Sequence, residues 1–433
     1  MKRLLVLATV VSVVLLVFTG CGGGDKKPAA AAAAAKPAEV SIRVLLSQHP
    51  YGDLLKPLVP EFEKQSGIKV NLESLQENQL NQKLTTEFAT NSSSVDVFMT
   101  RPLQESLLFN KNKWMAALDS YDFSDYPPSN VDLGRKDGKP YVVPLVVEWH
   151  VLYYRKDLLK KAGLKVPTTF AELETAAKAL NKDGVAGFAC RGAGAAAVTQ
   201  LSSFIYSYGG QFLDKGVAVF DKPEGLDAIR TYGRLLGSYG PQGITAMSWD
   251  QLIPVFQAGR LAMWADASVF YTQLIDPAKT QVPKENIGIA NLPAGPKKAM
   301  PYFPVAWGMA ISGQTKNFDA AKKFLDWATS KDMAVKAMLV NIPMSRNSAW
   351  QNAEARAKMN PELVDSQAHA AQNGYPYDRP FMTSVVKARD LIGECIIESI
   401  NSKGASAKLP ALVADKAKAV NELLKADGEY GGK

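Results

Sequence analysis

Residues 40–99 read VSIRVLLSQHPYGDLLKPLVPEFEKQSGIKVNLESLQENQLNQKLTTEFATNSSSVDVFM. Apolar residues alternate with other residues over 40–46 and again over 68–72, and such alternation predicts β-strands. A third short apolar segment, 95–99, closes the stretch. Three strands separated by helical segments predict an α/β fold, with parallel strands joined by right-handed crossovers.

The two segments between these strands have helical spacing. Apolar residues recur at every fourth position in each of them, which predicts helices over 53–66 and over about 80–88. Gly67 ends the first helix. Pro57 falls in an early turn of that helix, and Pro60 is expected to bend it or to delay its start.

A second unit of this kind is expected from the run VVPLVVEWHVLYYRKDLL onward, residues 142–159. This run is apolar enough to be a buried strand that passes from one lobe to the next. Thr169 and Glu172 predict a capping box at the start of a helix. The glycine- and alanine-rich segment 184–197 predicts a loop, and the apolar spacing of Asp319–Ser330 predicts an amphipathic helix.

The N-terminus has the pattern of an export signal. Lys2 and Arg3 precede an apolar run that is too short for a membrane span, and small residues follow it. Residues 1–20 are therefore predicted to be a signal peptide, with a permanent signal anchor as the alternative. Cys21 follows a glycine at the end of the run, and this position resembles a bacterial lipobox, although Phe18 replaces the usual leucine.

An acylated Cys21 would anchor the chain stably, because each buried CH₂ group contributes about 0.8 kcal/mol. The alternative is an ordinary secreted protein that is cleaved nearby. Residues 21–38 are rich in glycine, alanine, lysine and proline and predict a tether that buries almost nothing. The body is expected to lie outside the cytoplasm, on the periplasmic side of the membrane or at the cell surface.

Length and charge bound the remaining possibilities. About 395 residues follow the tether, which is too many for one compact core and favours two lobes. The formal net charge is +8 and falls to +6 when Lys2 and Arg3 leave with the signal. Since the basic residues are scattered, no nucleic-acid partner is expected. Cys190 and Cys395 could form a disulfide, but two buried free thiols are favoured.

Several segments, in order along the chain, resemble the family 1 extracellular solute-binding proteins of ABC importers, the maltose-binding-protein-like group that takes carbohydrates and polyols. Together they cover nearly all of residues 40–345. The segments are FEKQSGIKV (62–70), VDVFM (95–99), YRKDLLKKAGLKVPTTFAEL (154–173), YSYGGQFLD (206–214), WDQLIPVFQAGRLAMW (249–264), GIANLPAGP (288–296) and AWGMAISGQTKNFDAAKKFLDWATS (306–330).

The resemblance implies a periplasmic-binding-protein-like fold, in which two α/β lobes are joined by a hinge and close on a ligand in a central cleft. It implies an N-terminal lobe of residues 39–149, to which 302–343 return, and a C-terminal lobe of residues 150–301, to which 344–433 return. It also implies a monomer that captures a sugar or sugar alcohol and delivers it to the permease subunits of an ABC transporter.

Candidate ligand contacts follow from the chemistry of a sugar, which needs charged or amide groups for its hydroxyls and aromatic faces for its C–H groups. His49 and Tyr51 follow the first predicted strand, and Arg101 follows the third. Glu148 and His150 lie two residues apart in the run between the lobes, and the resemblance aligns Glu148 with an acid that contacts sugar. A satisfied surface histidine is the alternative for His49, and a structural salt bridge is the alternative for Glu148.

Five further candidates lie later in the chain, after residue 190. Arg191 could bind vicinal hydroxyls or a carboxylate, and Trp264 and Asp266 end a predicted strand. The resemblance makes Trp307 a platform for a sugar ring, with core packing as the alternative. Arg346 lies in a segment that resembles a loop near the cleft.

Two further features bear on the ligand. Val269 stands where the family usually has a tryptophan, which hints at a smaller or linear ligand. The cluster formed by Tyr375, Tyr377 and Arg379 lies beyond the reach of the resemblance and is given no role.

Other classes of function have weaker support. The chain has three histidines, no HExxH and no cysteine cluster, so no metal site is expected, and it has no Walker loop or GxSxG motif, so no cofactor or enzymatic activity is expected. A carbohydrate-active enzyme, a binding protein for a sugar acid or another small solute, and a surface adhesin remain the alternatives.

Overall fold

A computed structural model describes residues 40–432 of the chain. The predicted signal peptide, Cys21 and the tether over 21–38 lie outside the described residues. Residues 39–433 group into one compact unit. No helix of the described part has both the length and the apolar character needed to cross a membrane.

The first lobe is built on a five-stranded sheet. Its strands are ordered β2-β1-β3-β12-β6, and β1 pairs in parallel with both β2 and β3. The three strands predicted in 40–99 and their parallel pairing are therefore confirmed. β12 arrives from much later in the chain and pairs antiparallel with β3 and β6. The strands are β1 Ser41–Ser47, β2 Lys69–Leu75, β3 Val97–Thr100, β6 Val143–Val147 and β12 Val305–Ile311.

Two prolines break the first predicted helix of this lobe. The segment forms α1 (Pro50–Leu55), a 3-10 turn η1 (Lys56–Leu58) and α2 (Val59–Ser66) in place of one helix. Pro57 and Pro60 lie in the first turns of η1 and α2, where the missing N–H leaves no bond unmade. Gly67 ends α2 with a φ of 70°, as the sequence predicts.

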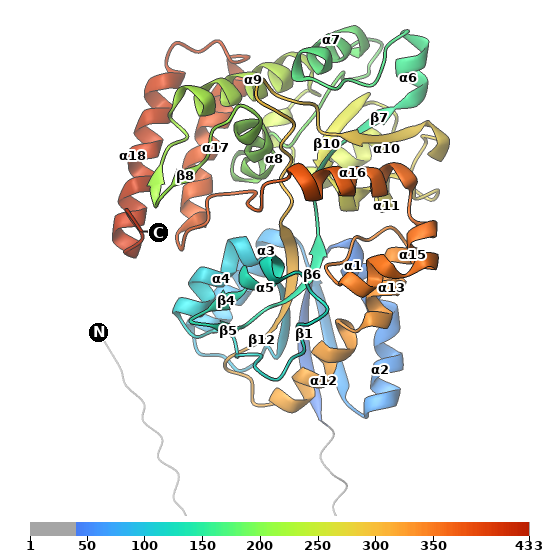
Figure 1. Cartoon of the computed structure of the whole chain (residues 1–433), viewed down its shortest axis with the longest axis vertical. Helices are drawn as coiled ribbons and strands as arrows, with labels where there is room; N and C mark the ends of the chain where they lie inside the picture. The colour runs from blue at the N-terminus through green and yellow to red at the C-terminus, as the bar shows by residue number, and fades with distance from the viewer. Residues whose placement is uncertain (1–39, 433) are drawn as a thin grey trace, which may run out of the picture. The chain divides into compact units, whose positions relative to one another are not determined.

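The other predicted helices of this lobe are confirmed. They are α3 (Glu77–Ala89) and α12 (Phe318–Ala328). Further helices of the lobe are α4 (Pro102–Lys111), α5 (Pro128–Asp132) and α13 (Lys331–Leu339). Within residues 40–432, Figure 1 shows these helices around the five-stranded sheet, in the part of the picture below the three-stranded sheet.

The second lobe has a smaller, antiparallel sheet of order β10-β7-β11. Its strands are β7 (His150–Arg155), β10 (Met263–Ala267) and β11 (Ile287–Asn291), and β7 is antiparallel to both neighbours. The expectation of a second parallel unit is thus wrong for these strands. β6, which directly precedes β7 in the chain, belongs to the five-stranded sheet. β7 therefore does not continue a strand–helix–strand unit with a parallel neighbour in its own sheet.

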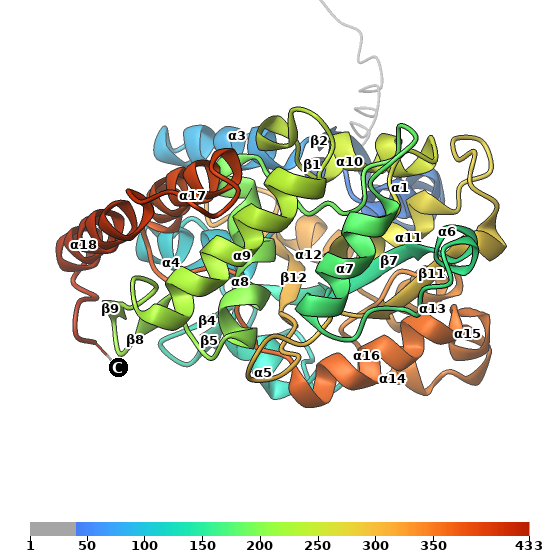
Figure 2. The same ribbon diagram turned by 90° about the horizontal axis from the view of Figure 1, so that it is seen from above.

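Helices cover this second sheet. α17 packs against α8, α9 and α18, and Figure 2 shows α17 and α18 side by side at one end of the lobe. The helices are α6 Lys156–Lys161, α7 Phe170–Leu180, α8 Gly194–Ser207, α9 Pro223–Tyr239, α10 Trp249–Gln257, α11 Tyr271–Leu274, α16 Pro361–Asn373, α17 Val385–Asn401 and α18 Leu409–Asp427.

Two local predictions in this lobe need correction. Thr169 does cap α7, accepting a hydrogen bond from the Glu172 N–H at 3.2 Å, but the Glu172 carboxylate bonds back to the N–H of Thr168. The segment 184–197 is a loop only in part, because its last four residues form the first turn of α8. The alanines that follow Gly194 favour a helix at that point.

Short elements complete the chain. α14 (Asn347–Gln351) and α15 (Ala353–Lys358) pack against α13, so they lie with the first lobe. The chain was predicted to return to the C-terminal lobe at residue 344, which is before α14 and α15, whereas the packing of these helices favours a later return. The lobe boundaries stay a prediction. The remaining elements are β4 Arg135–Lys136, β5 Lys139–Pro140, β8 Leu213–Asp214, β9 Val217–Ala218, η2 Ile244–Ala246, η3 Ser268–Phe270 and η4 Lys284–Asn286.

Two crossing segments run side by side between the lobes, and the segment at Pro343, which stays with the first lobe, lies beside one of them. Glu148 and Trp149 join β6 to β7, and the N–H of Glu148 donates to the Pro304 carbonyl at 3.2 Å. On the other side, the N–H of Val147 donates to the Pro343 carbonyl at 3.1 Å. The predicted passage of residues 142–159 from one lobe to the next is therefore confirmed, as one strand in each sheet with a short joint between them.

Candidate functional site

Four candidate side chains meet at one edge of the five-stranded sheet. His49 follows the end of β1, Arg101 the end of β3 and Glu148 the end of β6, while Trp307 lies near the start of β12. These strands run in compatible directions, so three carboxyl ends and one amino end share this edge. All four side chains line one small cavity.

His49 and Glu148 form a buried pair in this cavity. The N–H of Tyr51 donates to His49 Nδ1 at 3.1 Å, so the proton of the neutral ring lies on Nε2, which donates to Glu148 Oε1 at 3.1 Å. His49 bonds to Oε1 of Glu148, so the Oε2 atom of the same carboxylate does not bond to His49. Glu148 is therefore fixed in place and still able to accept from a ligand.

Arg101 and Trp307 form a second pair. The Arg101 guanidinium lies 5.5 Å from the centre of the Trp307 ring and pairs with the carboxylates of Glu77 and Glu105. Burial lowers the pKa of Arg101 to about 10, so the group stays charged at neutral pH. Trp307 sits at an irregularity in the pairing of β12 with β6, and it lines the cavity.

The second lobe contributes Arg191, which follows the segment paired with β10. Arg191 donates from Nε and Nη2 to Asp266 Oδ1, at 3.1 and 2.6 Å, and Gln200 donates to the same oxygen at 2.7 Å. Burial alone lowers the pKa of Arg191, but the Asp266 carboxylate outweighs it and holds this pKa above the ordinary value. Asp266 is fully buried and lies behind the cavity, so it orients Arg191.

Sequence reasoning missed the next group. Asp378 and Arg379 line the cavity, and Arg379 donates to Asp378 Oδ1 at 2.6 Å, to Gln104 Oε1 at 2.7 Å and to Thr199 Oγ1 at 3.4 Å. Burial tends to raise the pKa of Asp378, but the guanidinium of Arg379 more than offsets it and holds this pKa below the ordinary value. The Tyr-Asp-Arg-Pro run was the available signal, since Arg379 stood in the cluster that had no assigned role.

Thr199, Trp249 and Phe270 of the second lobe also line the cavity, and no pattern in the sequence pointed to them. The cavity has a volume of about 40 Å³. It combines three carboxylates, three guanidinium groups and three aromatic rings. Charge-assisted hydrogen bonds to hydroxyl groups and ring faces against C–H groups are the two kinds of contact that this set can offer.

Four other predicted residues lie outside this cavity. Tyr51 is fully buried and donates to the Ala328 carbonyl, and Trp264 is fully buried and stacks on Phe270 at 5.7 Å. His150 stacks on Tyr302 at 5.1 Å, and burial lowers its pKa to about 3. In the structure, these three side chains pack in the core.

Arg346 does not line the cavity. It donates to Asp125 at 2.8 Å and to the Thr329 carbonyl at 2.8 Å, and its guanidinium lies over the Tyr126 ring. These partners hold the loop that carries Arg346. The resemblance of that loop to one near the cleft therefore did not indicate where the Arg346 side chain lies.

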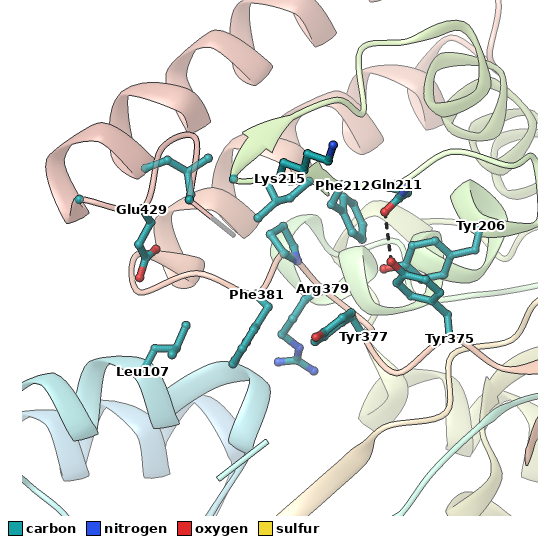
Figure 3. A pocket seen from close by; sticks show the side chains of 16 residues that line it. Leu107, Tyr206, Gln211, Phe212, Lys215, Tyr375, Tyr377, Arg379, Phe381 and Glu429 are labelled. Atoms are coloured by element: carbon teal, nitrogen blue, oxygen red, sulfur yellow. Dashed lines mark hydrogen bonds between the residues drawn. The ribbon is translucent and has the colours of Figure 1, made fainter. Parts of the chain in front are cut away.

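A second cavity, of about 550 Å³, lies beside the first and shares Arg379 with it. Figure 3 shows Tyr206, Phe212, Tyr375 and Tyr377 around it, with the hydrogen bond from the Tyr375 hydroxyl to Gln211 at 3.1 Å. Leu107 of α4 and Glu429 after α18 border its other side. Five of its sixteen lining residues are aromatic, whereas the carboxylate and guanidinium groups of the predicted set gather in the smaller cavity.

The cysteines and possible metal ligands of the described residues were compared with the predictions. Cys190 and Cys395 are both buried and free, as the favoured prediction has it. Within residues 40–432, no group of three or more histidine, cysteine, aspartate or glutamate side chains is placed to hold a metal ion.

Comparison with known proteins was made against families, curated proteins and solved structures. Residues 47–335 match the family described as bacterial extracellular solute-binding protein. A mannitol-binding protein of Pseudomonas aeruginosa is 29% identical over 284 residues, 62% of this chain and 65% of that protein, so the match spans just under two thirds of that relative.

Two further matches extend over more of the chain. A maltooligosaccharide ABC transporter solute-binding lipoprotein of Streptococcus pneumoniae is 26% identical over 442 aligned positions, which cover 96% of this chain and 98% of that protein. A solute-binding protein of an ABC transporter from Agrobacterium vitis S4, solved with bound D-mannitol, matches with a TM-score of 0.78 and 25% identity, covering 90% of this chain and 99% of that one. All three are named as binding proteins.

Proposed function

Since the chain belongs to the bacterial extracellular solute-binding protein family, we propose that it captures a sugar or sugar alcohol outside the cytoplasm and passes it to the permease of an ABC importer. The names of the relatives that bind mannitol or maltooligosaccharides support this class of ligand. No chemical step on the protein is part of the proposal.

One observation carries the proposal. The small cavity collects Glu148, Arg101 and Trp307 from one lobe and Arg191 and Arg379 from the other side of the cleft. A polyhydroxylated ligand would bond to the charged groups through its hydroxyls and lie against the tryptophan through its C–H groups. Because the contacts come from both lobes, such a ligand favours the conformation in which the lobes are close.

The volume of the cavity supports a closing motion. About 40 Å³ is far less than the roughly 300–1,000 Å³ of typical ligand pockets. A polyol therefore needs the lobes to part before it enters, and the crossing segments beside Glu148 and Trp149 are where the proposed hinge lies. Rotation about a few backbone bonds at such crossings is a common way for lobes to close.

The proposal includes a lipid anchor. Residues 1–20 have the composition of an export signal, and Cys21 stands where a lipoprotein signal places its acylated cysteine. The name of the pneumococcal relative, a lipoprotein, supports the same arrangement. An anchored, monomeric binding protein on a tether would stay close to the permease. Mass spectrometry of the membrane-bound protein tests this, since acylation adds the mass of the lipid to a chain that begins at Cys21.

A thermal-shift screen of the full-length chain tests the function. The panel contains monosaccharides, disaccharides, polyols, sugar acids and amino acids. A ligand at 100 times its dissociation constant adds about 2.7 kcal/mol to the free energy of unfolding, which raises the unfolding midpoint visibly. Stabilisation by one class of sugar or polyol supports the proposal, and no stabilisation by any class at saturating concentration contradicts it.

Glu148→Gln connects the function to the cavity. The substitution keeps the size of the side chain and removes its charge, so the affinity for the ligand should fall by about 10–100-fold. Asp96→Asn is the matched control, because Asp96 is a buried carboxylate of the same lobe that bonds to Arg43 and Thr315 away from the cavity. Isothermal titration calorimetry of both variants separates loss of a contact from loss of stability, and equal affinities in both would contradict the role of Glu148.

A further inference from the structure

Arg389 is a buried arginine whose partners carry no charge. It lies on α17, and its side chain is about 5% exposed. Its Nε donates to the Ala195 carbonyl at 3.0 Å, and its Nη1 donates to Gln104 Oε1 at 2.9 Å. Among residues 40–432, no carboxylate forms an ion pair with this guanidinium.

The other three arginines of the cleft are all neutralised. Arg191 pairs with Asp266 at 2.6 Å, and Arg379 donates to Asp378. Arg101 has two carboxylate partners, Glu77 and Glu105. Arg389 therefore differs from its neighbours in kind, because it is as buried as they are but lacks a counter-charge.

Gln104 brings this unpaired charge close to another one. Its amide oxygen accepts from Arg389 at 2.9 Å and from Arg379 at 2.7 Å, so two guanidinium groups share one neutral acceptor. Burial lowers the pKa of Arg389, and the nearby Arg379 and Arg101 lower it further. Burying a cation without a counter-charge costs free energy. An anion that binds beside such a cation would therefore be stabilised by its charge.

The space in front of Arg389 adjoins the proposed ligand site. A cavity of about 290 Å³ is lined by Arg389 and by the amide side chains of α3, and it shares Arg101, Arg191 and Trp249 with the smaller cavity. One end of a ligand held in the smaller cavity would thus reach the cavity that contains Arg389.

We propose that the ligand is a polyhydroxylated acid, an aldonate or uronate, whose carboxylate pairs with Arg389 while its hydroxyls occupy the smaller cavity. This inference rests on the proposed function, capture of a polyhydroxylated solute for import, and replaces the neutral sugar or sugar alcohol with the corresponding acid. A single guanidinium matches the single charge of a carboxylate. Glu77 and Asp390 also line the 290 Å³ cavity, and their charges disfavour the dianion of a phosphate ester more than the monoanion of a carboxylate.

Calorimetric titration of matched pairs tests the inference on the full-length chain. Each pair is a hexitol and the hexonate formed by oxidising one of its terminal CH₂OH groups, such as D-mannitol with D-mannonate, D-glucitol with D-gluconate, and galactitol with D-galactonate. In the pair that binds best, we expect the hexonate to bind at least about tenfold more tightly, as a charged hydrogen bond predicts. In Arg389→Gln, the ratio of the two dissociation constants should fall to about one, and Arg389→Lys should keep part of it.

The control is Arg155→Gln. Arg155 is a partly buried arginine of the same lobe that pairs with Asp157 at 2.6 Å, away from both cavities. Its replacement should leave the preference for the hexonate as it is in the unchanged protein. A preference that falls equally in both variants would overturn the assignment of the carboxylate to Arg389.

Stability gives a second, independent measurement. If Arg389 is retained for a ligand, Arg389→Met should leave the unfolding midpoint of the ligand-free chain unchanged or raise it, because the substitution removes an unpaired buried charge. A midpoint that falls as far as in Arg191→Met would mean that Arg389 has a structural role and would overturn the inference.

The outcomes separate the inference from the function on which it rests. Hexitols that bind as tightly as their hexonates, or more tightly, overturn the inference and leave the proposed function standing. A hexitol phosphate that binds more tightly than the hexonate overturns the choice of a carboxylate. Absence of binding by every probe overturns the inference, and the broader thermal-shift panel then decides whether the proposed function falls with it.

Discussion

His150 is a buried imidazole whose two ring nitrogens have no hydrogen-bond partner among the described residues. It stacks on Tyr302, and burial lowers its pKa from 6.5 to about 3. Between these values the unfolded chain takes up a proton that the folded protein does not. The neutral His150 ring therefore makes its full contribution to the free energy of unfolding above about pH 6.5, and this contribution is lost as the pH falls toward 3.

We predict that His150→Phe flattens this pH dependence. Phenylalanine keeps a ring against Tyr302 but cannot take up a proton, so the slope of the unfolding free energy below pH 6.5 should decrease by up to about 1.4 kcal/mol per pH unit. Urea unfolding at pH 7, 6, 5 and 4 measures the slope. His369→Gln is the comparison, since His369 is less buried and should leave most of the slope in place; an unchanged slope in His150→Phe would show that other groups cause it.

Asp266→Asn should destabilise the protein strongly. The substitution leaves Arg191 buried without a counter-charge, and breaking a buried ion pair from one side costs about 3–5 kcal/mol. Asp227→Asn, in an exposed pair with Arg230, should change the free energy of unfolding by less than about 0.5 kcal/mol. Urea midpoints at pH 7 compare the two, and similar losses would argue against the Arg191–Asp266 pair as a stabilising unit.

At this scale the sequence predicted some of the residues that line the candidate site. His49, Arg101 and Glu148 could be predicted because each follows a strand, and strand ends of a parallel sheet meet at one edge. Asp378 and Arg379 could not, since they lie in an irregular segment that no periodicity describes and that reaches the cavity only through long-range packing. Core packing and ligand contact also place similar demands on an aromatic side chain, and this is why Trp264 could not be told from Trp307.

At the scale of the elements, α9 and α17 approach each other closely. A Cβ atom at Gly233 would lie 2.1 Å from Ser399 Oγ, and one at Gly237 would lie 2.2 Å from the Ile400 carbonyl oxygen. Two glycines one helical turn apart thus let the backbones of these helices approach closely. This contact holds α17, and with it Arg389, against the rest of the lobe.

Gly233→Ala should therefore lower the free energy of unfolding by about 1–3 kcal/mol, because the added methyl group must displace the backbone of α17. Ser238→Ala, on the same helix but away from this contact, is the control and should have little effect. Chemical unfolding followed by circular dichroism measures both. Equal stability in the two variants would mean that α17 can shift without cost.

The elements themselves were mostly predictable. The helices and strands of residues 40–99 follow from spacing, and Pro60 predicted the late start of α2, whereas the separate elements α1 and η1 were not predicted. The direction of β12 and β7 was not predictable in the same way. A strand's own residues specify its burial, whereas its direction depends on partners that are distant in the sequence, as with β12 between β3 and β6.

For the whole molecule, the family and its periplasmic-binding-protein-like fold were predicted correctly, because ordered segments over most of the chain carry the resemblance. The position of 347–358 beside α13 was not, since short helices after a crossing can pack on either lobe and the choice depends on surfaces that exist only in the folded protein.

Closure on the ligand should be visible in solution. We predict that a saturating ligand from the thermal-shift screen decreases the radius of gyration measured by small-angle X-ray scattering, because contacts from both lobes stabilise the closed conformation. Glu148→Gln at the same ligand concentration should show a smaller decrease, and Asp96→Asn should match the unchanged protein. Identical scattering with and without a tightly bound ligand would contradict the proposed closure.

The joint at Glu148 and Trp149 has a consequence for how such a protein diverges. Glu148 faces the cavity, while the next side chain, Trp149, is anchored in the second lobe by its Nε1–H bond to Ser366 at 2.9 Å. Under the proposed function, a residue exchanged here would alter both ligand recognition and the torsional stiffness of the proposed hinge. Descendants that acquire new cargo should therefore vary first at positions remote from the hinge, such as Arg389 and Trp249, and keep the two residues of the joint as inherited.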